Sequence, residues 1–228
     1  MKDEHSIALN NMRNKVATII FGYGGAKHII DRHIELWKKH SDILIFSMPE
    51  DDYYEVSGHI VLRHDKSIKY GWGIIRRTMY TFKKALELNA DIFCFMEYDA
   101  VMLKRPIISE DRQIQANIFY SDPNFIFEGH RFEGKFFCHY PHVFTRKALE
   151  HLCSVMDETP FELGFQDRWL GAQLEKHNIP VFDLLTSGEG FSQNTIETPE
   201  PLIKALSEGR YAIHGIKSDA VYNAIPKT

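Results

Sequence analysis

The chain lacks several patterns that would each identify a class of protein. Its three cysteines, Cys94, Cys138 and Cys153, are odd in number and show no C-x-x-C spacing, which fits a reducing compartment better than a disulfide framework. No apolar run approaches the roughly 18 residues that a membrane span requires, and the polar start at 1–14 has no signal-peptide core. We therefore expect a soluble, cytoplasmic protein.

An excess of basic charge is also missing. Lys and Arg number 27 against 31 Asp and Glu, a net charge of −4, which argues against a nucleic-acid partner. The G-x-G-x-x-G fingerprint and the G-x-S-x-G elbow are absent, which disfavours a dinucleotide-dependent oxidoreductase and a serine hydrolase. His139 and His142 flank Pro141, but no cysteine or histidine lies at the spacing of a structural zinc site.

The chain that remains is typical of one α/β domain. At 228 residues, with 44% hydrophobic and 25% charged residues, it is long enough for one substantial core, and we assign 1–228 to a single domain. Apolar runs predict strands at 16–21, 43–46, 59–63 and 91–96, and apolar residues at helical spacing predict helices at 27–40 and 73–89. Alternating strands and helices predict a mostly parallel central sheet flanked by helices, with ligands at the carboxyl ends of its strands.

The second half is less regular. It predicts short strands at 125–128, 135–138 and 180–183, helices at 146–156 and 166–177, and loops around a short helix at 200–207 from about residue 187 onwards. We expect about 15–103 to bind a nucleotide and about 104–228 to bind an acceptor.

Two carboxylates follow the strand at 91–96. Glu97 and Asp99 are two residues apart, so their side chains point to the same side if the strand continues. Buried carboxylates repel each other and lose hydration, and a divalent cation such as Mg²⁺ or Mn²⁺ that also carries diphosphate oxygens would compensate them. An ordinary turn with two solvated acids is the structural alternative.

This order of features resembles the GT-A-fold glycosyltransferases. It comprises a first strand with a glycine-containing loop, an acidic end to the second strand, a basic helix, Glu97-Tyr98-Asp99, a downstream Gln166-Asp167 and a late His214. The resemblance is architectural, covers nearly the whole chain and implies a GT-A-like (Rossmann-like) fold. The family's strand-end motif is usually Asp-x-Asp, and here its first acid is Glu97.

The resemblance implies a metal site. Asp99 is the first choice of direct ligand and Glu97 the second, and His214 resembles the C-terminal histidine that often completes the site in this fold. Gly215 allows close approach of the backbone, and Lys217 could contact the diphosphate as a point charge. A surface or hydrogen-bonded histidine is the alternative for His214.

Asp167 is the candidate general base. Inverting members of the resembling family place their base in a comparable segment, commonly as Glu-Asp, and here Gln166 replaces the first acid. A carboxylate there could take the proton from an acceptor hydroxyl. Asp is also favoured at helix N-termini, so capping is an alternative role that can coexist with catalysis. Glu162 is a second candidate base.

The nucleotide side is marked by a loop, an acidic strand end and several cations. Gly22 allows close approach of a ligand, Tyr23 could stack on a base or ribose, and Asp51 or Asp52 could accept a hydrogen bond from either. A further group of cations lies before or in the 73–89 helix and could meet the diphosphate: Lys66, Lys69, Arg76 and Arg77. An acidic loop and a solvated helix face are the structural alternatives.

The sequence predicts a metal-dependent glycosyltransferase that moves a sugar from a UDP- or GDP-sugar to a glycan or other hydroxyl acceptor, with inversion. The acceptor should meet the aromatic and polar residues of the second half, in 128–132 and 136–142. A sugar nucleotidyltransferase and a non-catalytic nucleotide-sugar or glycan-binding domain are the two alternatives.

Overall fold

The computed structural model describes residues 14–64, 72–120, 126–127, 130–131, 136–156 and 166–226. Its centre is a seven-stranded sheet with the strand order β10-β6-β9-β4-β1-β2-β3. In chain order these strands are β1 Val16–Phe21, β2 Ile43–Pro49, β3 Ile60–His64, β4 Ile92–Glu97, β6 Ile114–Tyr120, β9 Phe136–Thr145 and β10 Phe182–Asp183. β1 to β4 run parallel, β10 runs parallel to β6, and β9 runs antiparallel to both β4 and β6.

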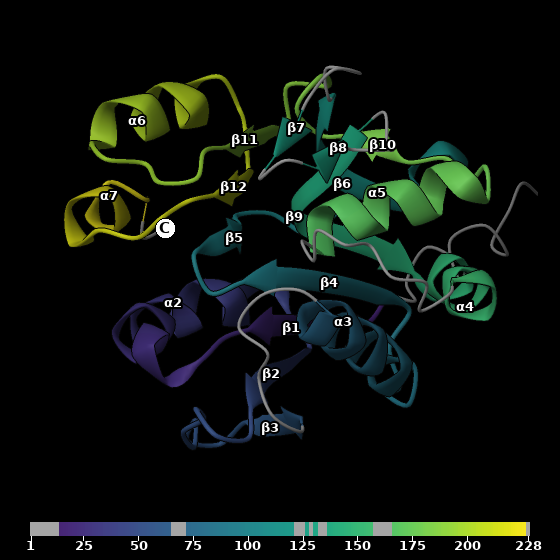
Figure 1. Ribbon diagram of the computed structural model, residues 1–228. Helices are drawn as coiled ribbons and strands as arrows, with labels where there is room; N and C mark the ends of the chain where they lie inside the picture. Colours follow the sequence, from purple (N-terminus) through teal and green to yellow (C-terminus); the bar gives the residue numbers. More distant parts are fainter. Residues whose placement is uncertain are drawn as a thin grey trace, which may run out of the picture.

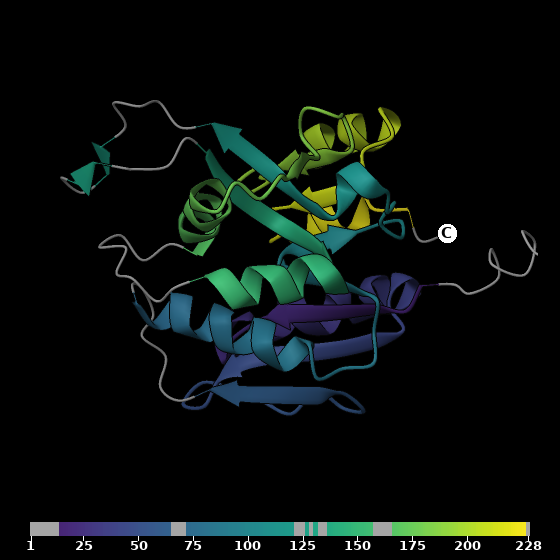
Figure 2. The ribbon, with the colours of Figure 1, turned by 90° about the vertical axis from the view of Figure 1, so that its right-hand side faces the viewer.

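Helices cover the two faces of this sheet. α3 (Trp72–Ala85) and α4 (Arg146–Val155) lie side by side in front of it in Figure 2, and α2 (Lys27–His40) lies behind. β1 is buried along its whole length, as expected of a strand that has a parallel neighbour on each side and helices on both faces. None of the helices in the described part of the chain combines the length and apolar character needed to cross a bilayer.

A smaller sheet packs against the β6–β9 side of the central sheet. It consists of β5 (Ala100–Met102), β11 (Gly190–Ser192) and β12 (Ala212–His214), in the order β11-β12-β5. α5 (Gln166–Lys176) lies on β9, and α6 (Pro199–Ser207) and α7 (Asp219–Asn223) lie together beside the small sheet (Figure 1). A β7–β8 ladder (Ile126–Phe127, His130–Arg131) and the 3-10 turns η1 (Gly24–Ala26) and η2 (Glu110–Arg112) complete the described elements.

One continuous hydrophobic core joins the two halves of the chain. It includes Phe93 from β4, Phe144 from β9, Trp169 from α5 and Ile213 from β12, each at most 1% exposed. The structure thus confirms a single α/β domain with a mixed, mostly parallel sheet, consistent with a Rossmann-like fold.

Several predicted elements were wrong in extent. The helix predicted at 73–89 ends at Ala85, because residues 86–90 turn away and the Arg146 guanidinium binds their carbonyls, at 3.0 Å for Leu86 and 2.9 Å for Ala90. The strand predicted at 135–138 is the longer β9, and the one at 180–183 is reduced to β10. The sequence did not predict β5, β6, β11, β12 or α7. The four strands among these pair with segments distant in the chain.

Candidate active site

Glu97, Asp99 and His214 lie together at the carboxyl end of β4. Glu97 ends β4, Asp99 sits in the turn before β5, and His214 ends β12, which pairs with β5. The His214 Nε2 lies 3.3 Å from Glu97 Oε2 and 3.5 Å from Asp99 Oδ1. One donor atom from each residue lies within 4.8 Å of the others. We call these three residues the acid–histidine cluster. They are the three residues that the resemblance assigned to one metal site.

The backbone around Asp99 is held by α2. His33 Nδ1 donates to the carbonyl of Tyr98 at 2.9 Å, and Trp37 Nε1 donates to the carbonyl of Ala100 at 2.9 Å. His33 and Trp37 are four residues apart on the buried face of the helix, so successive turns reach the two sides of the Asp99 turn. Sequence analysis predicted the helix at 27–40 but not this role of His33 and Trp37.

The segment after β12 holds the carbonyl between these two. The amides of Gly215 and Ile216 donate to the Asp99 carbonyl at 3.2 and 2.9 Å. Gly215 has φ +103°, and a Cβ there would lie 2.2 Å from the carbonyl oxygen of Gln193, so a side chain is excluded on two grounds. The close approach at Gly215 is to the backbone of Gln193 and of Asp99, and it places His214 beside Asp99.

The charges in the cluster oppose one another. Burial raises the pKa of Asp99, which is 1% exposed, and the His214 imidazole lowers it only in part; Lys217 Nζ lies 3.5 Å from its Oδ2. Burial alone would lower the pKa of His214, but its hydrogen bond to Glu97 and the charge of Asp99 raise it. For Glu97, burial opposes ionisation, but the hydrogen bond with His214 prevails and lowers its pKa. The two carboxylates thus favour positive charge at the position that His214 Nε2 faces.

The donor set of the cluster suits a small divalent cation. Asp99 Oδ1 is buried and accepts no hydrogen bond from the described residues, and a carboxylate oxygen in that condition is available as a ligand. His214 Nδ1 lies 3.0 Å from Ser192 Oγ, an outer contact that fixes the ring and leaves Nε2 directed at the acids. Asp99, Glu97 and His214 therefore offer two carboxylate oxygens and one imidazole nitrogen that could hold a metal ion.

The loop after β1 lies beside the acid–histidine cluster, because its Tyr23 contacts Tyr98, the residue between Glu97 and Asp99. Tyr23 is 39% exposed and packs edge-on against Tyr98, with ring centroids 5.3 Å apart. The Gly24 amide donates to the Asp52 carbonyl at 2.8 Å, and a Cβ on Gly24 would lie 2.3 Å from Asp52 Oδ1. The structure therefore brings Tyr23 and Asp52 to the same edge of the sheet, as predicted, while Asp51 is exposed.

Gly22, which was predicted to allow close approach of a ligand, instead packs closely against other parts of the protein. Its amide donates to the Ser47 carbonyl at 3.0 Å, and a Cβ there would lie 2.6 Å from Ile30 Cδ1, so the close approach is to α2. Arg77 on α3 donates to the Gly22 carbonyl at 2.8 Å and also to that of Ser47. Burial lowers the pKa of Arg77 to about 10.

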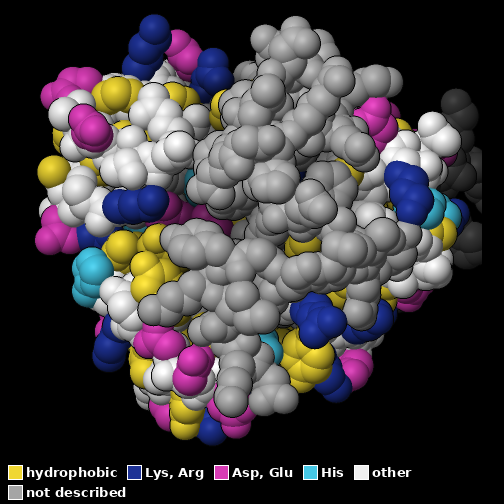
Figure 3. Space-filling view, viewed as in Figure 1, with side chains coloured by type: hydrophobic (Ala, Val, Ile, Leu, Met, Phe, Trp, Pro, Cys, Tyr) yellow, Lys and Arg dark blue, Asp and Glu magenta, His cyan; other side chains and the backbone are white. Residues whose placement is uncertain are grey.

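The other predicted cations fall in different places. Arg76 is exposed on α3, whereas Lys217 lies beside Asp99. Lys66, Lys69 and Glu162 lie outside the described residues. On the face seen in Figure 3, acidic and basic side chains are interspersed over the described surface, with no single-sign area.

Asp167 is the second residue of α5 and lies near the acid–histidine cluster without being part of it. Its Oδ2 is 3.1 Å from His139 Nε2, and its Oδ1 accepts from the amide of Arg168 at 2.9 Å. Burial opposes ionisation of Asp167, but the hydrogen bond from His139 outweighs it and lowers the pKa. The helix start is confirmed, and the bond to Arg168 is a local contact of the kind that favours Asp at helix N-termini.

Gln166 joins the two sides. Its Nε2 donates to Glu97 Oε1 at 3.1 Å, and its Oε1 accepts from Thr78 Oγ1 at 3.2 Å. The carboxylate requires a donor, which fixes the orientation of the amide. An acid at position 166 would set two carboxylates against each other, so glutamine is the residue that suits a glutamate at position 97.

Sequence analysis missed His139 and Ser192 as neighbours of these residues. The ring of His139 contacts that of His214 edge-on, with centroids 5.7 Å apart, so His139 lies between Asp167 and the cluster. His142 is fully buried, and its Nε2 lies 2.7 Å from the carbonyl oxygen of Cys138. No local pattern marks His139, because its position depends on the pairing of β9.

Comparison with models of known protein families and with curated protein sequences gave no match to this chain.

Proposed function

We propose that the protein is a metal-dependent glycosyltransferase. It transfers a sugar from a nucleotide-diphosphate sugar, a UDP- or GDP-sugar, to a hydroxyl of a glycan or other acceptor. The support is the position of the acid–histidine cluster at the carboxyl ends of parallel strands, where open α/β sheets bind ligands.

One observation carries the proposal. Within one site, three donor atoms lie within 4.8 Å of one another, and a separate carboxylate, Asp167, is linked to them through Gln166 rather than joining them. Sugar transfer requires this division of labour. The leaving diphosphate needs positive charge, and the attacking hydroxyl needs a base on the far side of the anomeric carbon.

Asp167 acts as the general base. It takes the proton of the acceptor hydroxyl while the hydroxyl oxygen bonds to the anomeric carbon. The bond from that carbon to the diphosphate breaks, and the diphosphate leaves with the electron pair, which inverts the configuration. Mn²⁺ or Mg²⁺, held by Asp99, Glu97 and His214, supplies Lewis-acid stabilisation of the leaving diphosphate. Lys217 adds a positive charge beside Asp99.

The nucleoside of the donor binds at the ends of β1 and β2. Tyr23 is exposed enough to offer a ring face or edge to a base, and Asp52 can accept hydrogen bonds from a base or ribose. Both are on the same side of the sheet as the cluster, so a diphosphate can extend from the nucleoside towards Asp99.

A donor screen tests the proposal. Thermal unfolding is followed for the protein with UDP- and GDP-sugars, each with Mn²⁺, with Mg²⁺ and with EDTA. We expect stabilisation by one class of donor that depends on the metal. Release of UDP or GDP is then measured with and without methyl glycosides as acceptors.

The outcomes separate the candidate functions. Metal-dependent release of nucleoside diphosphate, accelerated by an acceptor, supports the transferase. Stabilisation without turnover would identify a binding domain, and formation of pyrophosphate from a nucleoside triphosphate and a sugar phosphate would identify a nucleotidyltransferase. Asp99→Asn should abolish the metal-dependent stabilisation, and an unchanged shift would remove Asp99 from the metal site.

A further inference from the structure

His139 is the only partner on another element that the structure gives the Asp167 carboxylate among the described residues. Its Nε2 lies 3.1 Å from Asp167 Oδ2, and nitrogen next to a carboxylate at this distance carries a proton and donates it. The other oxygen, Oδ1, accepts from the neighbouring amide of Arg168 at 2.9 Å.

These two contacts pull the carboxylate in different directions. Amides in the first turn of a helix lack intrahelical acceptors, so a carboxylate at position 167 can rotate to cap them. The hydrogen bond from His139 keeps Oδ2 turned away from the helix, on the side of the acid–histidine cluster, where the His139 ring also meets His214.

The His139 ring is itself well supported. It sits on β9, where it pairs with Asn117 of β6. The rings of Phe119 and Phe137 pack against it with centroids 4.6 and 5.4 Å away. A side chain packed between two aromatic rings on a paired strand can fix the direction of its hydrogen bond.

We propose that His139 is a positioning residue that aims the Asp167 carboxylate at the acceptor hydroxyl. This inference rests on the proposed function. His139 acts through Asp167, and its contribution is the direction of one N–H donor, so a neutral side chain with a donor in a similar place should retain part of it.

The test compares two substitutions at His139. His139→Leu removes the donor, and His139→Gln keeps an amide N–H at about the place of Nε2. The donor and methyl glycoside selected by the screen above are used to measure kcat, both KM values and donor affinity by calorimetry. Thermal unfolding checks that each variant is folded.

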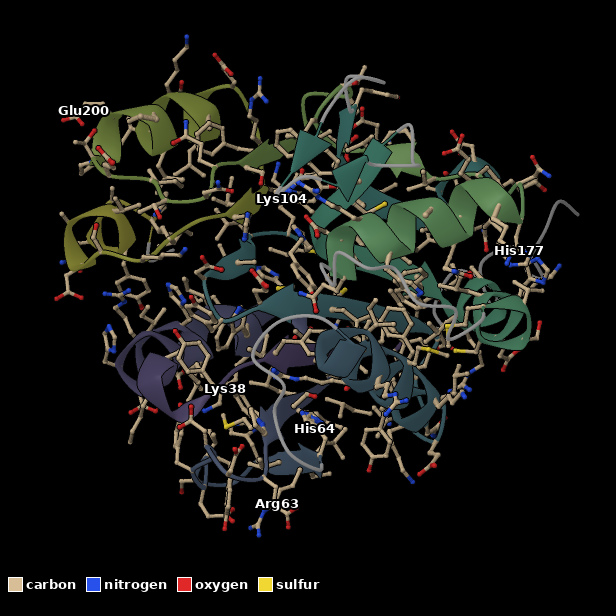
Figure 4. The ribbon with its side chains drawn as sticks, in the orientation of Figure 1. Lys38, Arg63, His64, Lys104, His177 and Glu200 are labelled. Atoms are coloured by element: carbon tan, nitrogen blue, oxygen red, sulfur yellow. The ribbon has the colours of Figure 1, made fainter. Side chains whose placement is uncertain are left out.

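The matched control is His177, a half-buried histidine just beyond the far end of α5 (Figure 4). It follows Asp167 by ten residues, which corresponds to about 15 Å along the helix axis. His177→Leu and His177→Gln should leave the kinetic constants unchanged.

We expect His139→Leu to lower kcat by about 100-fold, because a small displacement of a reacting group has effects of this size. Donor affinity should be unchanged, and His139→Gln should recover most of the loss. Turnover by His139→Leu within about twofold of wild type, or equal losses in the Leu and Gln variants, would overturn the inference and leave the proposed function intact. If the wild-type protein transfers no sugar from a donor that it binds, the proposed function fails, and the role of His139 fails with it.

Discussion

Asp99 is held by its backbone, whereas Asp167 is held by its side chain. The carbonyls of residues 98 to 100 receive hydrogen bonds from α2 and from the segment after β12, all at 3.2 Å or less. The Asp167 carboxylate is oriented by one imidazole and one neighbouring amide. The two acids face the same site. The position of Asp99 is fixed by hydrogen bonds to its buried backbone, whereas the orientation of the Asp167 carboxylate is fixed by two side-chain contacts.

This difference predicts that substitutions near the two acids will have different effects. Changes around Asp99 should alter the free energy of unfolding together with metal binding, because they remove buried hydrogen bonds of the core. Changes around Asp167 should alter turnover with little effect on stability.

The largest effect is expected at Asp167. Asp167→Asn keeps an oxygen that can accept from His139 but has no charge to take up a proton. We expect kcat for transfer to fall by about 10²- to 10⁴-fold, with donor affinity and thermal stability close to wild type. Initial rates and calorimetry measure both. Near-normal turnover would leave Asp167 with its helix-terminal role alone.

Lowering the pH should reduce the free energy of unfolding through His33, which holds the backbone beside Asp99. His33 is buried and its pKa is lowered to about 4, chiefly by desolvation, so the folded state holds it neutral. Protonation in the unfolded chain begins near 6.5, so the stability that His33 contributes is complete above that pH and is lost as the pH falls towards 4. The loss is at most about 3 kcal/mol.

Urea unfolding at pH 7.0, 5.5 and 4.5 measures this loss. His33→Asn keeps a donor for the Tyr98 carbonyl and removes the titrating ring, so its stability should fall less with acid than that of wild type. His64 on β3, near α3 in Figure 4, and His142 also have pKa values lowered to about 4 by burial, so part of the slope should remain. Equal slopes in the variant and wild type would contradict the role of His33.

A pair of buried tryptophans tests the backbone side directly. Trp37→Phe leaves the buried carbonyl of Ala100 without its donor, which should cost about 1–3 kcal/mol beyond the lost ring area. Trp169 is equally buried, but its Nε1 has no hydrogen-bond partner among the described residues, so Trp169→Phe loses ring area without losing a hydrogen bond. Denaturant unfolding of both variants isolates the hydrogen bond, and metal affinity should fall only in Trp37→Phe.

The sequence anticipated the two sides unequally. Glu97 ends a buried apolar run that could be read from the sequence, so the position of the two acids at a strand end was predicted. The strand does not continue to Asp99 as the period-two argument required, because Asp99 lies in the turn before β5 and is placed by α2 and the segment after β12. His214 and Asp167 were proposed from resemblance, and the structure places them at the site. His139, Ser192 and Thr78 had no signal, because each meets the site through an element from a distant part of the chain.

The fold shows the same limit. The apolar runs of β1, β2 and β4 are long enough to read directly, and the sheet built from them was predicted. β12 has three residues, Ala212 to His214, and pairs with β5 and β11 at once. Such a strand is defined by its partners, which lie more than a hundred residues away for β5, and its own sequence does not distinguish it from a loop.

The smallest expected effect tests whether the two sides communicate through Gln166. Thr78→Val removes the donor to Gln166 Oε1 and leaves the amide free to turn away from Glu97. Thr81, on the same helix and fully buried, bonds Ser47 Oγ at 2.8 Å and has no contact with Gln166 among the described hydrogen bonds. Each valine variant should lose about 0.5–1.5 kcal/mol of stability, the value of one neutral hydrogen bond.

Turnover should separate them. In Thr78→Val the weakened hold on Gln166 should disturb Glu97 and the start of α5 together, and lower kcat by less than about tenfold, the limit set by the loss of roughly 1 kcal/mol. Thr81→Val should transfer sugar at the wild-type rate. Equal rates in both variants would mean that the Asp99 and Asp167 sides are positioned independently, because a link through Gln166 requires its amide to be held at both ends.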